Sequence, residues 1–134
     1  MGDELLLVAA SHLFDRPVEA SGAREFLSRQ GHHCLVAFVD GGAVGFVTGV
    51  EMVHPDKRPE MLLYELGVDE SARRRGVGSA LVTALRDLAR DLGLRGMWVL
   101  TDAANDAALA TYRRTGATDA GQSTMLEWSF DDVG

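Results

Sequence analysis

The chain contains one cysteine, three prolines and no long apolar run. A single cysteine excludes a disulfide-stapled scaffold, and Cys34 lies beside Leu35 and Val36 in a predicted strand, so we expect a small buried side chain and not a nucleophile. No apolar stretch approaches the roughly 18 residues that span a bilayer. The segment from Leu5 to Ala10 lacks the basic start and the cleavage site of a signal peptide. We therefore expect a cytoplasmic protein without a membrane partner.

Basic residues are in the minority, with 13 Lys and Arg against 20 Asp and Glu, for a net charge of −7. Such a charge repels nucleic acid, so we expect no nucleic-acid partner, whereas a cationic small molecule or a basic peptide would be attracted. An acidic surface also promotes solubility, so the charge alone identifies no ligand. The four histidines, His12, His32, His33 and His54, show no metal-ligand spacing, and we expect no metal site.

The length of 134 residues and the ordinary hydrophobic content indicate one domain, 1–134, and hydrophobic periodicity indicates a mixture of helices and strands. It predicts helices over 4–14, 20–30, 77–92 and 106–114. It predicts strands over 34–39, 43–53, 61–68, 97–101 and 124–130. The Asp40-Gly41-Gly42 sequence is typical of the tight turn in a hairpin of the first two strands.

The segment Arg73-Arg74-Arg75-Gly76-Val77-Gly78-Ser79 joins the strand 61–68 to the long amphipathic helix that follows. The first amides of a helix have no partner within it and lie at the positive end of its dipole, so they can bind an anion. Glycines would let a diphosphate approach these amides closely, and the arginines add positive charge. A charged turn that caps an ordinary helix is the alternative. The pattern matches neither the Walker P-loop nor the Gly-x-Gly-x-x-Gly dinucleotide fingerprint.

A second motif follows about thirty residues later. Residues 105–117 read Asn-Asp-Ala-Ala-Leu-Ala-Thr-Tyr-Arg-Arg-Thr-Gly-Ala. This segment is similar to the Asn-x-x-Ala-x-x-x-Tyr-x-x-x-Gly-Phe segment of the GNAT superfamily of N-acetyltransferases, with Ala117 in place of the final Phe. The loop 73–79 resembles the Arg/Gln-x-x-Gly-x-Gly/Ala acetyl-CoA loop of the same superfamily. The resemblance covers roughly residues 34–130.

The resemblance implies the GNAT-like acyl-CoA N-acyltransferase fold, with a mixed, mostly antiparallel central sheet flanked by helices. The family's usual first strand is missing in this sequence, which would leave a sheet edge available to a second subunit in a homodimer. The resemblance also implies acetyl-CoA as cofactor. By the same resemblance, the cofactor-binding residues would be Leu66, Gly67, Val68, Arg73, Arg74, Arg75, Gly76, Val77, Gly78, Ser79, Asn105, Ala108 and Tyr112.

Acetyl transfer to an amine needs a group that takes a proton from the amine and a group that protonates the departing thiolate. Glu65 is the only acid within the apolar run 61–68 and is our candidate for the first role. Alternatively, strand alternation merely places Glu65 on a solvated face. Tyr112 is the candidate for the second role, and a half-buried structural tyrosine is its alternative.

A narrower resemblance concerns the acceptor. Tyr64-Glu65-Leu66-Gly67-Val68 is similar to the Tyr-Asp-Leu-Ala-Val strand of aminoglycoside 3-N-acetyltransferases, with Glu65 replacing their aspartate. We expect a cationic amine to be bound by Glu51, Glu65, Asp102 and Glu127. A polyamine, an amino acid or a protein amine remains an alternative acceptor. A module that binds acyl-CoA without turnover remains an alternative function.

Overall fold

The central sheet has four strands, β1 (His32–Val39), β2 (Gly42–Met52), β3 (Glu60–Val68) and β4 (Met97–Trp98), which lie in this order across it. This computed structural model describes residues 3–131. The pairs β1–β2 and β2–β3 are antiparallel, and β4 runs parallel to β3. The predicted α/β fold with a mixed, mostly antiparallel sheet is thus confirmed.

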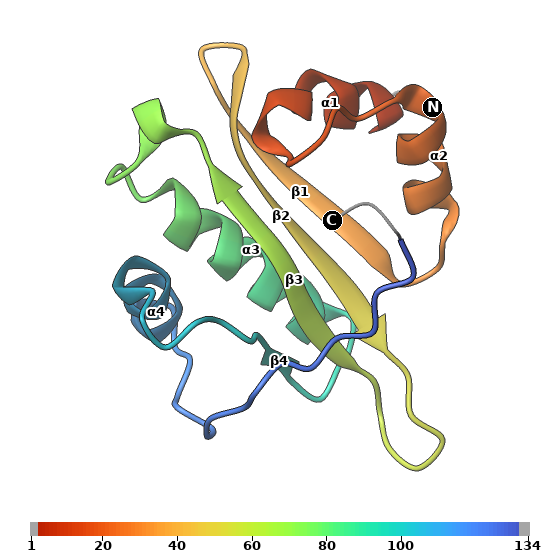
Figure 1. The fold of residues 1–134 in the computed structure, drawn as a ribbon, viewed down its shortest axis with the longest axis vertical. Coiled ribbons are helices and arrows are strands. Elements are labelled where there is room, and N and C mark those ends of the chain that lie inside the picture. The colour runs from red at the N-terminus through yellow and green to blue at the C-terminus, as the bar shows by residue number, and fades with distance from the viewer. Residues whose placement is uncertain (1–2, 132–134) are drawn as a thin grey trace.

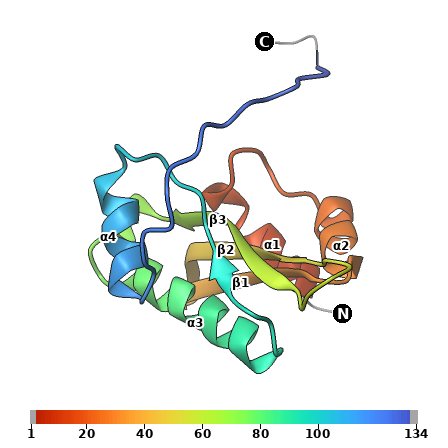
Figure 2. The same ribbon diagram turned by 90° about the horizontal axis from the view of Figure 1, so that it is seen from below.

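Helices cover both faces of the sheet (Figures 1 and 2). They are α1 (Asp3–Ala9), α2 (Ala20–Ser28), α3 (Val77–Asp91) and α4 (Asp106–Arg114). α3 lies along one face with α4 beside it, while α1 and α2 lie on the other face near β1. Among residues 3–131, no helix is long and apolar enough to cross a membrane.

The main core lies between α3 and the sheet. The apolar stripe of α3 packs against inward-facing side chains of β2 and β3, as its helical spacing predicts. The buried residues of this core are Val47, Met61, Leu63, Leu81, Val82, Leu85, Ala89 and Tyr112. At Gly49, a Cβ atom would lie 2.8 Å from Met61 Sδ and 3.0 Å from Leu85 Cδ1. A side chain at this position would displace the ends of Met61 or Leu85, so the glycine helps α3 to approach the sheet this closely.

A β-bulge at Tyr64 interrupts the pairing of β2 with β3. Thr48 pairs with Glu65 and Gly49 pairs with Leu63, so Tyr64 has no partner in β2. Leu63 and Leu66 both pack against the α3 core, although they are three positions apart. Regular alternation would place Leu63 and Leu66 on opposite faces of the sheet. Because of the extra residue they share the α3 face, and Tyr64 and Glu65, which lie between them, are both on the other face.

Three predicted elements differ from the structure. The predicted helix 4–14 stops at Ala9 and is followed by a separate 3₁₀ turn, Ser11–Leu13. The predicted strand 97–101 forms ladder pairs only at Met97 and Trp98. The predicted strand 124–130 is wrong for this chain on its own, because the segment has no ladder partner and is exposed throughout. Strand formation needs a paired neighbour, which local sequence preference cannot supply.

Candidate functional site

The sheet opens between β3 and β4. Only two residue pairs, Met61 with Met97 and Leu62 with Trp98, join these strands. Beyond Leu62, the β3 edge that includes Leu66, Gly67 and Val68 is therefore left without a strand partner among the described residues. An unpaired strand edge offers amides and carbonyls to an extended ligand.

The N-terminus of α3 lies beyond the end of this open edge. Gly76 precedes the helix in the left-handed conformation, with φ of 80°, and no side chain caps the helix. The amides of Val77, Gly78 and Ser79 have no hydrogen-bond partner among residues 3–131. Three adjacent free amides at the positive end of a helix suit an anion.

Gly78 leaves room for a ligand at these amides. A Cβ atom at this position would lie 3.7 Å from Val68 Cγ2 and 3.8 Å from Thr111 Cγ2, which is ordinary contact. The fold itself thus does not require glycine at Gly78. Its lack of a side chain instead leaves the helix terminus accessible, which fits a diphosphate group.

Arginines surround the same helix terminus. Arg73, Arg74 and Arg75 are exposed, and Arg73 Nε donates to Val68 O at 3.4 Å. Arg114, at the end of α4, donates from Nε to Ser79 Oγ at 3.2 Å. This fourth arginine was missed in the sequence, because only the packing of α4 against α3 brings it to the loop.

α4 supplies the other side of the opening. Asn105 caps this helix, since its Oδ1 accepts from the amide of Ala108 at 3.1 Å, and Ala108 packs against the core. Tyr112 is 9% exposed, and burial raises its pKa. Its hydroxyl makes no hydrogen bond with another described residue, yet it is not among the fully buried polar atoms, so it retains contact with solvent. A phenol in this state keeps its proton at neutral pH and has it free to donate.

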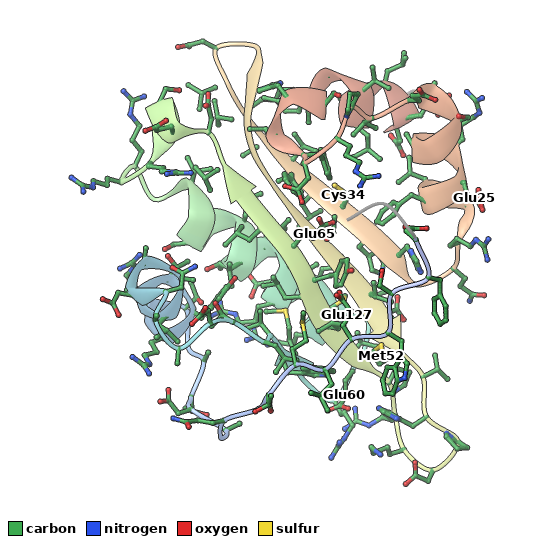
Figure 3. The ribbon with its side chains drawn as sticks, in the orientation of Figure 1. Glu25, Cys34, Met52, Glu60, Glu65 and Glu127 are labelled. Atoms are coloured by element: carbon green, nitrogen blue, oxygen red, sulfur yellow. The ribbon has the colours of Figure 1, made fainter. Side chains whose placement is uncertain are left out.

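Glu65 lies on the face of the sheet opposite α3, partly buried near Cys34 (Figure 3). Its amide donates to Thr48 Oγ1 at 3.0 Å. Burial raises the pKa of its carboxyl, and the nearby Asp15 carboxylate raises it further, against an opposing hydrogen bond from Thr48. Burial and the Glu65 charge together raise the pKa of Cys34 to about 12, so this thiol stays protonated and unreactive.

Asp15 was not predicted from the sequence, and tertiary packing brings it near Glu65. The preceding residue, Phe14, stacks on Phe46 of β2 with a ring centroid distance of 3.9 Å. Phe46 in turn lies against Gly67, where a Cβ atom would be only 2.5 Å from Phe46 Cε1. The Phe14 stack therefore holds the chain before α2 over the Glu65 side of the sheet. Two neighbouring carboxylates favour a cation between them.

The structure does not bring the other predicted acceptor residues to Glu65. Glu51 follows Val47 and Gly49 in alternation on the α3 face, and its Oε2 lies 2.7 Å from His33 Nε2, so its role in acceptor binding stays a prediction. Asp102 is exposed and accepts from the amide of Ala104 at 2.8 Å, in a local turn. Glu127 is exposed on the C-terminal stretch that follows α4 (Figure 3). The alternation that places Glu51 opposite Glu65 could be recognised only once the bulge at Tyr64 was known.

The residues 3–131 contain no group of three or more His, Cys, Asp or Glu side chains arranged to hold a metal ion.

Comparisons with known proteins agree with this arrangement. Residues 4–117 match the model of the Acetyltransferase (GNAT) family, and this range includes both the loop 73–79 and the segment from Asn105 to Gly116. The chain is 32% identical to human N-acetyltransferase 8 over 79% of its own length and 47% of that protein. The chain spans about half the length of the first curated relatives it matches.

Solved structures share the fold. An aminoglycoside acetyltransferase from an uncultured soil metagenomic sample, in complex with trehalose, has a TM-score of 0.87 at 23% identity, over 97% of this chain and 91% of that one. An aminoglycoside N-acetyltransferase in complex with CoA has a TM-score of 0.76 at 22% identity, over 95% of this chain and 88% of that one. At these identities the likeness concerns the fold.

Proposed function

Since the chain belongs to the GNAT acetyltransferase family, we propose that it transfers the acetyl group of acetyl-CoA to a primary amine of a small cationic acceptor. The observation that carries the proposal is the set of three unpartnered amides at the start of α3, surrounded by four arginines and next to the open edge of β3. Backbone amides and guanidinium groups are the usual partners of phosphate oxygens.

In this proposal the cofactor is held from two sides. The amides of Val77, Gly78 and Ser79, with the arginines of the loop and Arg114, bind the diphosphate. The free β3 edge from Leu66 to Val68 pairs with the extended arm of the cofactor, while Asn105 and Ala108 line its other side. Acetyl-CoA supplies an activated thioester, and binding along a strand edge holds that group in a fixed orientation.

Glu65 and Tyr112 carry the proton transfers. An amine enters mostly as its ammonium form and must lose a proton before it can attack the thioester carbon. Glu65 accepts this proton, directly or through a water molecule, and its raised pKa brings it closer to the pH at which a general base works best. Tyr112 donates its proton to the thiolate when the carbon–sulfur bond breaks, and the second proton that the nitrogen loses as the amide forms restores the phenol. Its raised pKa ensures that the proton is present at neutral pH.

The acceptor is expected to be cationic, because the Asp15 carboxylate is close enough to Glu65 to raise the pKa of its carboxyl, and a cation between the two would be favoured. The net charge of −7 acts in the same direction. Aminoglycosides are the acceptor class that we propose to test first, since both solved structures described above are aminoglycoside acetyltransferases. Acetylation at the 3-amino group is the specific product proposed from the Tyr64-to-Val68 segment. Polyamines, amino acids and protein amines are the competing acceptors.

The test measures thiol release from acetyl-CoA with a panel of amines, alongside calorimetric titration of acetyl-CoA. The panel contains an aminoglycoside, a polyamine, a diamino acid and a lysine peptide, with a neutral amine of similar size as a control. Turnover with the cationic members supports the proposal, and mass spectrometry of the product identifies the acetylated nitrogen. Tight acetyl-CoA binding without turnover on any amine would favour a non-catalytic acyl-CoA-binding module. Failure to bind acetyl-CoA would overturn the proposal.

A further inference from the structure

Thr48 is a buried polar residue in the middle of the sheet, and its side chain is 4% exposed. It belongs to β2, which has a strand on each side, and it pairs with Cys34 of β1 and with Glu65 of β3. The three residues form one row across the sheet. Because a central strand is held by both of its neighbours, Thr48 is a rigid support for the group that its side chain contacts.

The side chain of Thr48 points away from the core between α3 and the sheet. Val47, the residue before it, is part of that core, and Gly49, the residue after it, lies against Leu85 of α3. Alternation along the strand therefore places Thr48 on the other face, which is the face of Glu65. A hydroxyl buried on this face needs hydrogen-bond partners.

Both partners of the Thr48 hydroxyl come from Glu65. The oxygen accepts a hydrogen bond from the amide of Glu65 at 3.0 Å. A hydroxyl also has one proton to donate, and the Thr48 hydroxyl donates it to the Glu65 carboxyl, which favours the ionised form of that group. Thr48 thus binds Glu65 at two points, one on the backbone and one on the side chain.

The bulge in β3 is the reason that this double contact matters. Tyr64 is the extra residue, and a bulge that moved by one position would leave Glu65 without a partner and change where its side chain points. The bond between the Glu65 amide and Thr48 stabilises the arrangement in which Glu65 is paired. Threonine suits this position, because its branched Cβ restricts the rotation of the side chain.

We propose that Thr48 is the positioning residue of the proton acceptor, and that its hydroxyl holds the Glu65 carboxyl in the orientation that meets the amine. This inference rests on the proposed function, in which Glu65 takes the proton. Thr48 touches neither the amine nor the thioester and acts only through Glu65.

The surroundings of Glu65 predict the direction of the effect on pH dependence. Its titratable neighbours are the Asp15 carboxyl, from the chain before α2, and the Cys34 thiol of β1. On its own strand, Tyr64 shares the same face and is exposed. Burial and Asp15 disfavour the ionised carboxylate, whereas the Thr48 hydroxyl favours it. Loss of the hydroxyl should therefore raise the pKa of Glu65 further, so that it acts as a base only at higher pH.

The first test compares Thr48→Val, which removes the hydroxyl at nearly constant shape, with Thr48→Ser, which keeps the hydroxyl. With the best amine of the panel, the acid limb of kcat/KM should move up by about 0.5 to 1 pH unit in Thr48→Val and stay in place in Thr48→Ser. The kcat of Thr48→Val at pH 7 should fall by about 10 fold, with the Kd of acetyl-CoA within about twofold. Thr83→Val, the same change on α3, is the matched control and should leave the profile unchanged.

The second test asks whether Thr48 acts through Glu65. When Thr48→Val is added to Glu65→Gln, kcat should fall by less than about twofold further, because the carboxylate that Thr48 holds is already absent. A further loss as large as that of Thr48→Val alone would overturn the proposal. If Glu65→Gln itself keeps the wild-type kcat, the proposed role of Glu65 fails and this inference fails with it. An impaired Glu65→Gln beside a normal Thr48→Val would refute the positioning role alone.

The third test needs no turnover. The Glu65 carboxyl carbon is followed by NMR as the pH is changed, in the unaltered chain and in Thr48→Val, and urea unfolding checks that the variant folds. Thr48→Ala takes the place of Thr48→Val if the valine variant does not fold. The midpoint should be higher in the variant without the hydroxyl, and equal midpoints would overturn the proposal.

Discussion

The N-terminus of α3 and the Glu65 face of the sheet are the two halves of the proposed site, and they are built in different ways. The first consists of backbone amides and arginines from seven consecutive residues, together with Arg114 from the end of α4. The second brings Glu65 from β3 together with Asp15 from the chain before α2, through the stacking of Phe14 on Phe46. The proposed anion site is therefore local in sequence, whereas the proposed acceptor site depends on tertiary packing.

If the two halves are independent, changes in one should leave ligand binding at the other intact. The largest effect is expected from Glu65→Gln, which should lower kcat by about 10² to 10⁴ fold because the general base is lost. Its acetyl-CoA affinity should stay within about twofold, a change of less than roughly 0.5 kcal/mol. The loss in kcat should shrink as the pH rises, since more of the amine is then already deprotonated. Steady-state kinetics from pH 6 to 10 with calorimetry checks this, with Glu25→Gln on α2 as the control. An equal loss in acetyl-CoA affinity would mean that the halves are coupled.

Tyr112→Phe tests the proposed proton donor to the thiolate. We expect kcat to fall by about 10² fold, because the thiolate loses its proton donor while the ring still fills the core. Unfolding by urea should show a nearly unchanged stability. The loss in kcat should be larger for an acceptor that attacks the thioester quickly. With such an acceptor, departure of the thiolate limits turnover. Wild-type rates with every acceptor would remove Tyr112 from the chemistry.

Gly78→Asp is directed at the amides alone. A carboxylate in the first turn should stabilise α3 through its dipole, and the space around Gly78 admits a side chain. The same carboxylate repels a diphosphate, so acetyl-CoA affinity should fall by about 10 to 100 fold, on the scale of one charge-assisted hydrogen bond. Calorimetry should thus show weaker acetyl-CoA binding, while thermal unfolding should show a higher Tm. Gly78→Ala, which adds bulk without charge, should have a smaller effect, and Arg73→Glu/Arg75→Glu should reproduce the loss of affinity.

Asp15→Asn probes the acceptor half with a smaller expected effect. The KM for a dicationic acceptor should rise by about 2 to 10 fold, because one partly solvated carboxylate is lost. The KM for acetyl-CoA and the kcat should change little. Glu19→Gln, also before α2, is the matched control. Equal effects of Asp15→Asn on cationic and neutral amines would show that Asp15 shapes the site without recognising charge.

The smallest effect concerns stability. The carboxyl pKa of Glu65 is raised in the folded state, so the ionised form is disfavoured there relative to the unfolded chain. The resulting loss of folding stability is fully present above the raised pKa. It vanishes below the ordinary pKa of about 4.3, where the carboxyl is protonated in both the folded and the unfolded chain. Glu65→Gln should therefore be more stable than the unaltered chain at pH 8, and the difference should disappear near pH 4. Urea unfolding at the two pH values measures it, and a stability difference independent of pH would show that ionisation of Glu65 is not its cause.

The two halves also differ in how much of each could be predicted from the sequence. Helix 106–114 and the long helix that begins at Val77 were predicted with accurate starts, because capping residues, glycines and helical periodicity are local signals. The loop 73–79 could be recognised for the same reason. Asp15 and Arg114 could not, since their places depend on the Phe14 stack and on the packing of α4 against α3.

The predictions that depend on tertiary partners are the least certain from sequence. Glu51 was predicted as an acceptor residue from the family topology, and in the structure its carboxylate contacts His33. The strand 124–130 was predicted from a correct pattern, yet no strand in the same chain pairs with it in the structure. Sequence preference describes what a segment can form, and the partner decides whether it forms.

The bulge at Tyr64 has a further consequence for how this scaffold can change. Tyr64 is 66% exposed and has no partner in β2, so the ladder places little constraint on its side chain. Glu65 is fixed separately, through the pairing of its own residue with Thr48. Residue 64 can therefore vary in size and charge beside the proposed acceptor site, while Glu65, the proposed proton acceptor, stays in place. Saturation mutagenesis at this one position should yield folded enzymes with different acceptor preferences, which makes the bulge a point of evolutionary plasticity.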